Sequence, residues 1–157
     1  MNSLSALLAI LLVAPVMAQK AEPVRLADSQ IRLGSIRIGS SQKDAAQRFG
    51  RPIQKNPTAD PMFCNSEIEL KYKGVRTYFC DNSLVNLACS VRKYATPAGA
   101  RVGMQSSQVI ALYGHPEFLT KDNQTELIYR SLDSETALVF HIENGEVKSI
   151  ELWCDFT

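Results

Sequence analysis

The chain lacks a charge excess of either sign, because 17 Lys and Arg residues stand against 16 Asp and Glu residues for a net charge of +1. Nucleic acids and anionic membranes attract proteins with clustered basic side chains, so we expect no nucleic-acid partner. Glycine and proline are scarce, with 8 and 7 residues among 157, which excludes collagen-like and low-complexity sequence. Hydrophobic residues make up 45%, enough for a folded core.

Catalytic and metal-binding motifs are missing as well. The sequence contains no Gly-x-Ser-x-Gly, no His-Glu-x-x-His, no phosphate-binding glycine loop and no dinucleotide fingerprint. No Cys-x-x-Cys pair occurs, and the two histidines, His115 and His141, stand at unrelated spacings. We therefore expect a protein that is not an enzyme and that uses no cofactor and no metal.

The N-terminal segment holds the one long hydrophobic run. Residues 6–14 are apolar throughout and are followed by Pro15 and the small-residue pattern that ends at Ala18. The run is shorter than the ~20 residues that span a bilayer. This pattern predicts a signal peptide at residues 1–18, with an uncleaved interfacial anchor as the alternative. We expect a periplasmic or secreted protein with no stable membrane insertion after signal cleavage, beginning with a loose leader at residues 19–30.

A repeat organises the rest of the chain. The segment from Ile38 to Pro52 recurs 64 residues later, from Val102 to Pro116. Each copy has a short extended entry, a serine cap and about two turns of helix, followed by glycine and proline as a stop signal. The repeat therefore predicts two similar units, one in each half of the chain.

Alternating apolar and polar residues after each helix predict strands. In the first copy the strands are expected at residues 67–73, 75–80 and 85–94. The second copy shows the same pattern, with strands expected at residues 125–132, 135–143 and 147–156. The prediction is an α+β fold of two tandem modules, each a helix followed by a three-stranded antiparallel meander, with the helices packed on one sheet face. The modules cover residues 31–94 and 101–157, and residues 95–100 link them.

If Phe79 pairs with Leu87 across a three-residue loop, the alternation also assigns residues to a core face, which packs on the helices. Ala45, Phe49, Val109, Leu112 and Tyr113 are expected to cover it from the helices. From the strands it includes Ile68, Leu70, Tyr72, Val75, Phe79, Leu87, Cys89, Val91, Leu138, Phe140, Ile142, Ile150, Leu152 and Cys154.

Four cysteines in an exported chain favour two disulfides, and three pairings are possible. Cys64 and Cys80 end neighbouring strands of the first copy, whereas Cys89 and Cys154 lie on corresponding last strands and face the same way. We therefore expect Cys64 to pair with Cys80 and Cys89 to pair with Cys154, the second bond joining the repeats.

The opposite face of the predicted sheet carries the candidate binding residues. Its members are Arg76, Tyr78, Ile128, Arg130, Val139, His141 and Trp153. Tyr, Trp and Arg are enriched at protein interfaces because they bury a large area and keep a polar end. A register slip of one residue would instead place Trp153 in the core. Asp81, in the turn after residue 80, is a candidate inserting element.

The repeated segments resemble a known motif. Residues 39–41 with 50–52, and 103–106 with 114–116, are similar to the Gly-Met-Thr-x-x-x-Val…Leu-Gly-x-Pro signature of the SmpA/OmlA (BamE-like) fold. Their tandem arrangement resembles the beta-lactamase inhibitory protein (BLIP) family. The resemblance implies either a scaffold in envelope assembly or inhibition of a secreted enzyme by surface binding. The chain lacks the lipid-bearing cysteine of the lipoproteins and a cysteine pair in its second repeat.

From these observations we expect an exported, non-enzymatic protein-binding module. It would act as an envelope or periplasmic scaffold or adaptor, and its partner would be another protein bound at the exposed sheet face. The alternative is a BLIP-like inhibitor of a secreted or periplasmic hydrolase.

Overall fold

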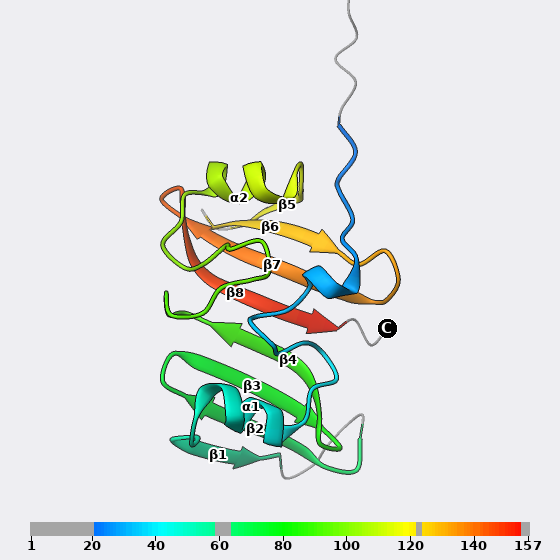
Figure 1. Cartoon of the computed structure of the whole chain (residues 1–157), viewed down its shortest axis with the longest axis vertical. Helices are drawn as coiled ribbons and strands as arrows, with labels where there is room; N and C mark the ends of the chain where they lie inside the picture. Colours follow the sequence, from blue (N-terminus) through cyan, green and yellow to red (C-terminus); the bar gives the residue numbers. More distant parts are fainter. Residues whose placement is uncertain (1–20, 59–63, 122–123, 155–157) are drawn as a thin grey trace, which may run out of the picture.

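The computed structural model describes residues 21–58, 64–121 and 124–154 (Figure 1). One helix precedes four strands, and this order of elements occurs twice. The first set is α1 (Gln42–Phe49), β1 (Gln54–Pro57), β2 (Glu67–Tyr72), β3 (Val75–Cys80) and β4 (Ser83–Cys89). The second set is α2 (Ser106–Tyr113), β5 (Glu117–Lys121), β6 (Gln124–Arg130), β7 (Thr136–Glu143) and β8 (Glu146–Cys154). A 3₁₀ turn, η1 (Asp28–Gln30), comes before α1.

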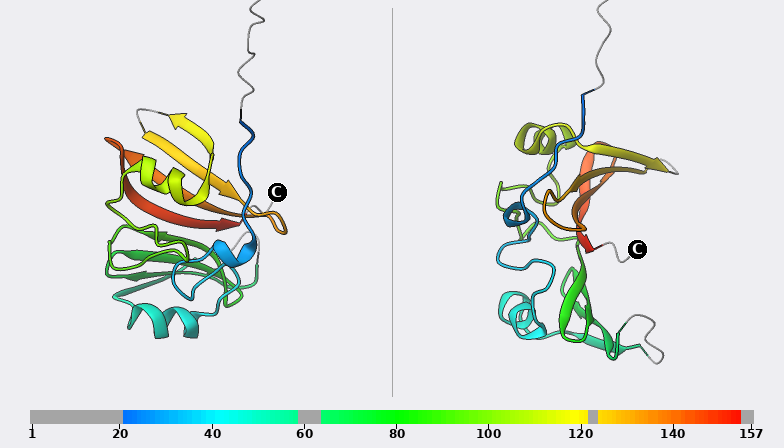
Figure 2. Two further views of the ribbon diagram at one scale, coloured as in Figure 1. Left: turned by 45° about the horizontal axis from the view of Figure 1, so that its top comes forward. Right: turned by 90° about the vertical axis from the view of Figure 1, so that its right-hand side faces the viewer.

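All eight strands form one antiparallel sheet in the order β1-β2-β3-β4-β8-β7-β6-β5. Both helices lie on the same face of this sheet (Figure 2). The expected mixture of helices and antiparallel strands is therefore confirmed. The expectation of two three-stranded meanders is wrong, because β1 and β5 add an edge strand to each half and the strands join into a single sheet. These two strands escaped sequence analysis because they are short and β1 shows no alternation of apolar and polar residues.

Capping fixes where the helices begin and end. At α1 the Ser41 hydroxyl accepts from the Asp44 amide at 3.2 Å, and the Asp44 carboxylate accepts from the Ser41 amide at 2.9 Å. The cap of α2 is Gln105 and not the expected serine, with its amide donating to the side chain of Gln108. Each helix is followed by a glycine with φ near +89°, a conformation that other residues rarely adopt.

The core lies between the helices and the sheet, and its face was predicted correctly. The strand residues assigned to it are buried or pack against the buried cluster, except Cys154, which is only partly buried and lies outside that cluster. Among the helix residues Leu112 is the exception, with 43% of its surface exposed. The β3–β4 register differs from expectation, since Phe79 pairs with Leu84 and not with Leu87. A bulge between Tyr78 and Phe79 restores the alternation, so the same side chains still point inward.

The predicted disulfide between Cys64 and Cys80 is confirmed, with Cα atoms 5.7 Å apart. The predicted pair of Cys89 and Cys154 is wrong, because Cys89 lies opposite Ile150 in the antiparallel β4–β8 pair. Cys154 is four residues further along β8, about 13 Å away at ~3.3 Å per residue. A disulfide requires Cα atoms within ~7 Å. The Cys89 thiol is instead buried, and its Sγ donates to the carbonyl of Val91.

The expected signal peptide at residues 1–18 lies outside the described residues. The expected loose leader is attached to the fold from Val24 onward, since the amides of Val24 and Leu26 donate to the carbonyls of His115 and Arg130. Leu26 is buried. Within the described residues, no helix combines the length and the hydropathy needed to cross a bilayer.

Cys89 provides a chemical test of the corrected disulfide pattern. Burial raises the pKa of its thiol and removes it from solvent. We expect iodoacetamide at pH 8 to leave Cys89 unmodified in the native protein and to alkylate it in urea without reductant, as measured by peptide mass spectrometry. Cys64 and Cys80 should react only after reduction. Recovery of a peptide linking Cys89 to Cys154 would contradict the structure.

Candidate protein-binding face

The sheet face opposite the helices, here called the outer face, is concave. In the right-hand view of Figure 2, β5 and β6 at one end and β1 and β2 at the other extend beyond the central strands on this side. Strand alternation and register place five predicted residues on the outer face: Arg76, Tyr78, Arg130, His141 and Trp153. The alternative that Trp153 lies in the core is therefore not what the fold adopts.

Glu69 of β2 organises one polar cluster on the outer face. Its carboxylate accepts from Asn56 Nδ2 at 2.6 Å and from the Tyr78 hydroxyl at 2.8 Å. Arg76 Nε and Lys71 Nζ lie 3.3 and 3.4 Å from the same carboxylate. Burial alone would raise the pKa of Glu69, but the hydrogen bonds from Asn56 and Tyr78 and the charge of Lys71 outweigh it and lower the pKa. Glu69 is thus charged at neutral pH and holds Tyr78 in place.

His141 of β7 organises a second polar cluster at the centre of the sheet. Its Nε2 lies 2.9 Å from Glu151 of β8, and its Nδ1 lies 3.3 Å from Glu126 of β6. Asn86 of β4 donates to the other oxygen of Glu151 at 2.5 Å. The hydrogen bond to Glu151 is the main reason that the pKa of His141 is raised, and the charge of Glu126 adds to it. Since only the protonated imidazole can donate from both nitrogens, the geometry favours the charged form.

The pKa of the Glu151 carboxylate shifts in the opposite direction to that of His141. Burial alone would raise its pKa, but the hydrogen bonds from His141 and Asn86 lower it below the usual value. The two groups therefore stabilise each other as an ion pair.

The Trp153 ring, with the Arg130 guanidinium over it, is the aromatic part of the outer face. The Arg130 guanidinium lies over the Trp153 ring, 5.7 Å from its centroid, and its Nε donates to Glu117 at 2.9 Å. Beneath them Ile128, Ala137 and Val139 form a second small buried cluster, against which Trp153 packs. Ile128 and Val139 were predicted to point outward. Both do point outward, but neighbouring side chains bury them, so they support the outer face without being accessible to a partner.

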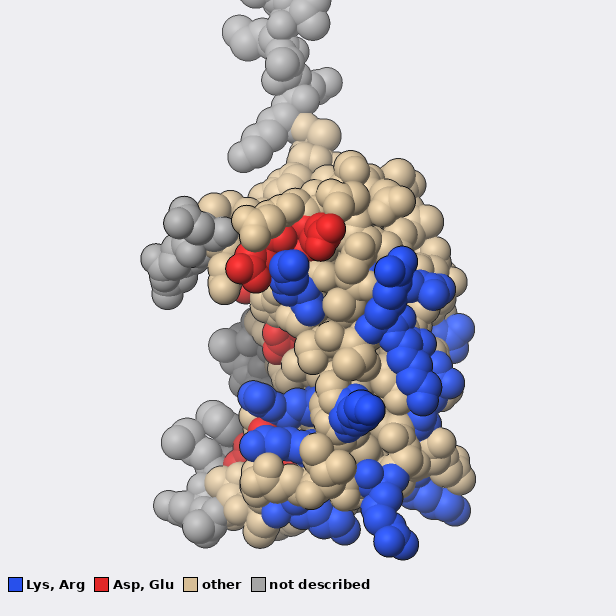
Figure 3. All heavy atoms as spheres, turned by 90° about the vertical axis from the view of Figure 1, so that its left-hand side faces the viewer, with Lys and Arg blue, Asp and Glu red and all other residues tan. Residues whose placement is uncertain are grey.

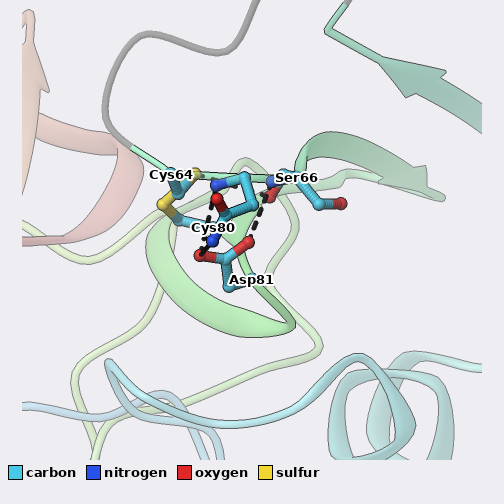
Figure 4. Close-up of a disulfide and its surroundings, with 5 residues drawn as sticks. Cys64, Ser66, Cys80 and Asp81 are labelled. Atoms are coloured by element: carbon cyan, nitrogen blue, oxygen red, sulfur yellow. Dashed lines mark hydrogen bonds between the residues drawn. A yellow bond between two sulfur atoms is a disulfide. The ribbon is translucent and has the colours of Figure 1, made fainter.

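Asp81 does not lie on the outer face. It follows β3 beside the disulfide, where its carboxylate accepts from the backbone amide of Ser66 at 2.8 Å and from Asn65 at 3.3 Å (Figure 4). The predicted inserting acid therefore holds the chain segment at residues 65–66. Its closeness to Cys64 and Cys80 does not make a metal site, because both sulfurs are in the disulfide.

The structure brings together residues that sequence analysis treated separately. Arg76 and Tyr78 meet at Glu69, and Arg130 meets Trp153. Sequence analysis missed Glu69, Asn86 and Glu151. For Glu69 the available signal was alternation, because Glu69 precedes the core residue Leu70 and so lies on the same face as Tyr78, with which it pairs.

Comparison with known proteins gives remote structural similarity alone. No protein-family model matches the chain, and no curated protein sequence is significantly similar to it. An extracellular SCP-domain protein from Bacillus anthracis aligns with 91% of this chain at 12% identity and a TM-score of 0.48, and this chain spans half of its length. A DUF4309 family protein from Bacillus subtilis aligns with 74% of the chain and 79% of its own length, at 12% identity and a TM-score of 0.45. A proposed beta-lactamase inhibitor protein from Streptococcus mutans aligns with 76% of the chain and 91% of its own length, at 14% identity and a TM-score of 0.36.

The His141–Glu151 pair predicts a pH window of stability. Because the pKa of His141 is raised on folding, its contribution to the free energy of unfolding is complete below pH 6.5 and is lost as the pH rises through its pKa in the folded state. Because the pKa of Glu151 is lowered on folding, its contribution to the free energy of unfolding is complete above pH 4.5 and is lost as the pH falls through its pKa in the folded state. The coupling energy between the two side chains should therefore be largest between pH 4.5 and 6.5, on the order of 1 kcal/mol.

Urea unfolding of the native chain, His141→Gln, Glu151→Gln and the double variant gives this coupling at each pH. We expect it to decline towards pH 9. A coupling energy that is the same at pH 5.5 and pH 9 would contradict the assignment.

Proposed function

We propose that this chain is a non-enzymatic module that binds another protein with its outer face. The observation that carries the proposal is that Tyr78, Arg130 and His141 are each fixed by a hydrogen bond to a carboxylate of the same concave surface. Side chains that are already ordered lose little entropy when a partner binds. An ordered surface that presents Tyr, Trp and Arg is typical of protein interfaces.

The apolar anchor of this interface would be the Trp153 ring. The ring packs on Ile128, Ala137 and Val139 from below, and Arg130 lies against it. Its position is therefore determined before a partner arrives. Arg76, whose side chain is more than half exposed, would supply an accessible charge at the other end of the surface.

We favour a scaffold or adaptor over an inhibitor of a hydrolase. An inhibitor of the expected kind inserts an acidic turn into its target, and Asp81 is the candidate for that role. The Asp81 carboxylate is occupied by Asn65 and Ser66 of its own chain, so insertion would first have to break those hydrogen bonds. An exported location is compatible with the Cys64–Cys80 disulfide and with the predicted signal peptide.

Two adjacent residues of β5 allow a direct test of the face that binds. Leu119 pairs with Glu126 on the outer face, whereas Phe118 pairs with Leu127 on the helix side, and the two are 51% and 49% exposed. We expect p-benzoylphenylalanine at position 119 to give a specific protein adduct in cells of the source organism. The same probe at position 118 should give none. Adducts are identified by mass spectrometry.

Tyr78→Ala in the position-119 probe should lower the adduct yield roughly tenfold if Tyr78 is a main contact. Tyr78 is a better choice than Trp153, whose removal would also disturb the cluster on which it packs. An envelope component as the adduct supports a scaffold, and a secreted hydrolase supports an inhibitor. Adducts formed equally from positions 118 and 119 would contradict binding through the outer face.

A further inference from the structure

A cavity of about 660 Å³ lies on the helix side, between residues 35–40 and α1. Its lining includes the side chains of Arg37, Arg48, Ser40 and Gln47. The volume falls in the range of small-molecule sites. The cavity is separated from the outer face by the sheet, so nothing argued for it depends on the proposed function.

Arg48 is held in position without using its hydrogen-bond donors. Its guanidinium carbon lies 5.3 Å from the centroid of the Tyr94 ring. Its other neighbour is Gly34, where an added Cβ would lie 2.7 Å from Arg48 Nη2. Among the described residues no hydrogen bond or ion pair engages the Arg48 guanidinium. A placed guanidinium with unused N–H donors is suited to bind an anion from solution.

Other donors surround the same space. The Ser40 hydroxyl accepts from the backbone amide of Arg37 at 3.1 Å, which leaves its own O–H able to donate. Lys93 Nζ lies 5.4 Å from the centroid of the Tyr94 ring that Arg48 also contacts, but Lys93 does not line the cavity. Asp44 does line the cavity and keeps its negative charge, while its carboxylate accepts hydrogen bonds from the backbone amide and hydroxyl of Ser41.

The positive charge around the cavity is only partly offset within the described part of the chain: Asp44 lines the cavity, and the charge of Arg37 helps to lower the pKa of Asp28. The six ion pairs there use Glu69, Glu117, Glu126, Glu146 and Glu151, none of which lines the cavity. Figure 3 shows the result on one side of the molecule: Lys and Arg side chains gather towards the helix side and the lower half, away from most Asp and Glu side chains. The helix side of a nearly neutral protein is thus locally basic.

We propose that this cavity binds the phosphate group of a phosphorylated ligand. Arg48 would donate two parallel hydrogen bonds to phosphate oxygens, as its planar fork favours. Arg37 would balance part of the second negative charge, and Ser40 and Gln47 would donate to the remaining oxygens. Three phosphate oxygens can accept from these donors at once, whereas a carboxylate offers two, which favours phosphate. Soluble molecules and lipid headgroups both carry such a phosphate, and the test separates these two sources.

Calorimetric titration of the native chain with sodium pyrophosphate in 150 mM NaCl measures the site directly. We expect Arg48→Gln to weaken binding about tenfold or more, the effect of removing a charge-assisted hydrogen-bonded pair. The matched control is Lys43→Gln, which removes the same charge from an exposed position of α1 that does not line the cavity. Its affinity should stay within about twofold of the native value.

Gly34→Ala distinguishes specific binding by the positioned Arg48 guanidinium from nonspecific attraction of the anion to positive charge. The variant keeps every charge, but the added methyl group would displace the Arg48 guanidinium. We expect the same loss of pyrophosphate binding as for Arg48→Gln, measured on protein whose thermal unfolding shows that it is folded. If Gly34→Ala fails to fold, Arg48→Lys, which keeps the charge without the fork, takes its place.

Vesicles of phosphatidylglycerol and of phosphatidylcholine form the second arm. Sedimentation with phosphatidylglycerol vesicles that depends on Arg48, without pyrophosphate binding, assigns the site to a lipid headgroup. Pyrophosphate binding that depends on Arg48 assigns it to a soluble phosphate. Equal losses in Arg48→Gln and Lys43→Gln, or no binding in either arm, would overturn the proposal.

Discussion

The pairing of β4 with β8 is the interaction on which the rest of the structure depends. These are the last strands of the two halves, and four residue pairs join them, from Asn86 opposite Trp153 to Cys89 opposite Ile150. Leu87 and Leu152 meet there on the core face and are fully buried. Separated, each half would expose an unpaired edge beside those apolar side chains, which favours aggregation. Joined, the halves share one core and one sheet.

The central polar cluster of the outer face extends across the same junction. Glu151 receives a hydrogen bond from Asn86 of the first half and lies against His141 of the second. The carboxylate that accepts from His141 is therefore itself held by a hydrogen bond across the junction. No disulfide crosses it, since the one bond between described cysteines closes a loop within the first half. Backbone pairing, apolar packing and this cluster hold the two halves together.

Sequence alternation was sufficient to predict which side chains face the core, because the side-chain period of a strand is fixed at two. It remained correct at Phe79 even though the pairing partner was wrong, since a bulge compensated for the shorter turn. It failed for Cys89 and Cys154, because sharing a face does not place two residues at the same height along antiparallel strands. It also missed β1 and β5, whose short edge sequences carry little periodic signal.

The candidate site was predictable in outline and not in its contacts. Alternation put Tyr78, His141 and Trp153 on one face, but nothing local in the sequence shows that Glu69 and Glu151 hold two of them. The leader shows the same limit. Its residues look unstructured in isolation, yet Leu26 is buried through backbone pairing with a strand more than a hundred positions away. Contacts of this kind depend on the strand order, which the repeat alone does not determine.

A net charge of +1 hides an uneven distribution between the two faces. On the outer face acids and bases lie within ion-pair distance, so each charge is largely satisfied before any partner arrives. Around α1 the Arg37 and Arg48 side chains have no acidic counterpart among the described ion pairs. A partner of the outer face is then selected mainly by shape and aromatic contact, because new ion pairs there would have to replace existing ones. The cavity beside α1 differs in that Arg48, which lines it with Arg37 and Asp44, has no ion-pair partner among the described residues, so an anion from outside can pair with it without replacing one.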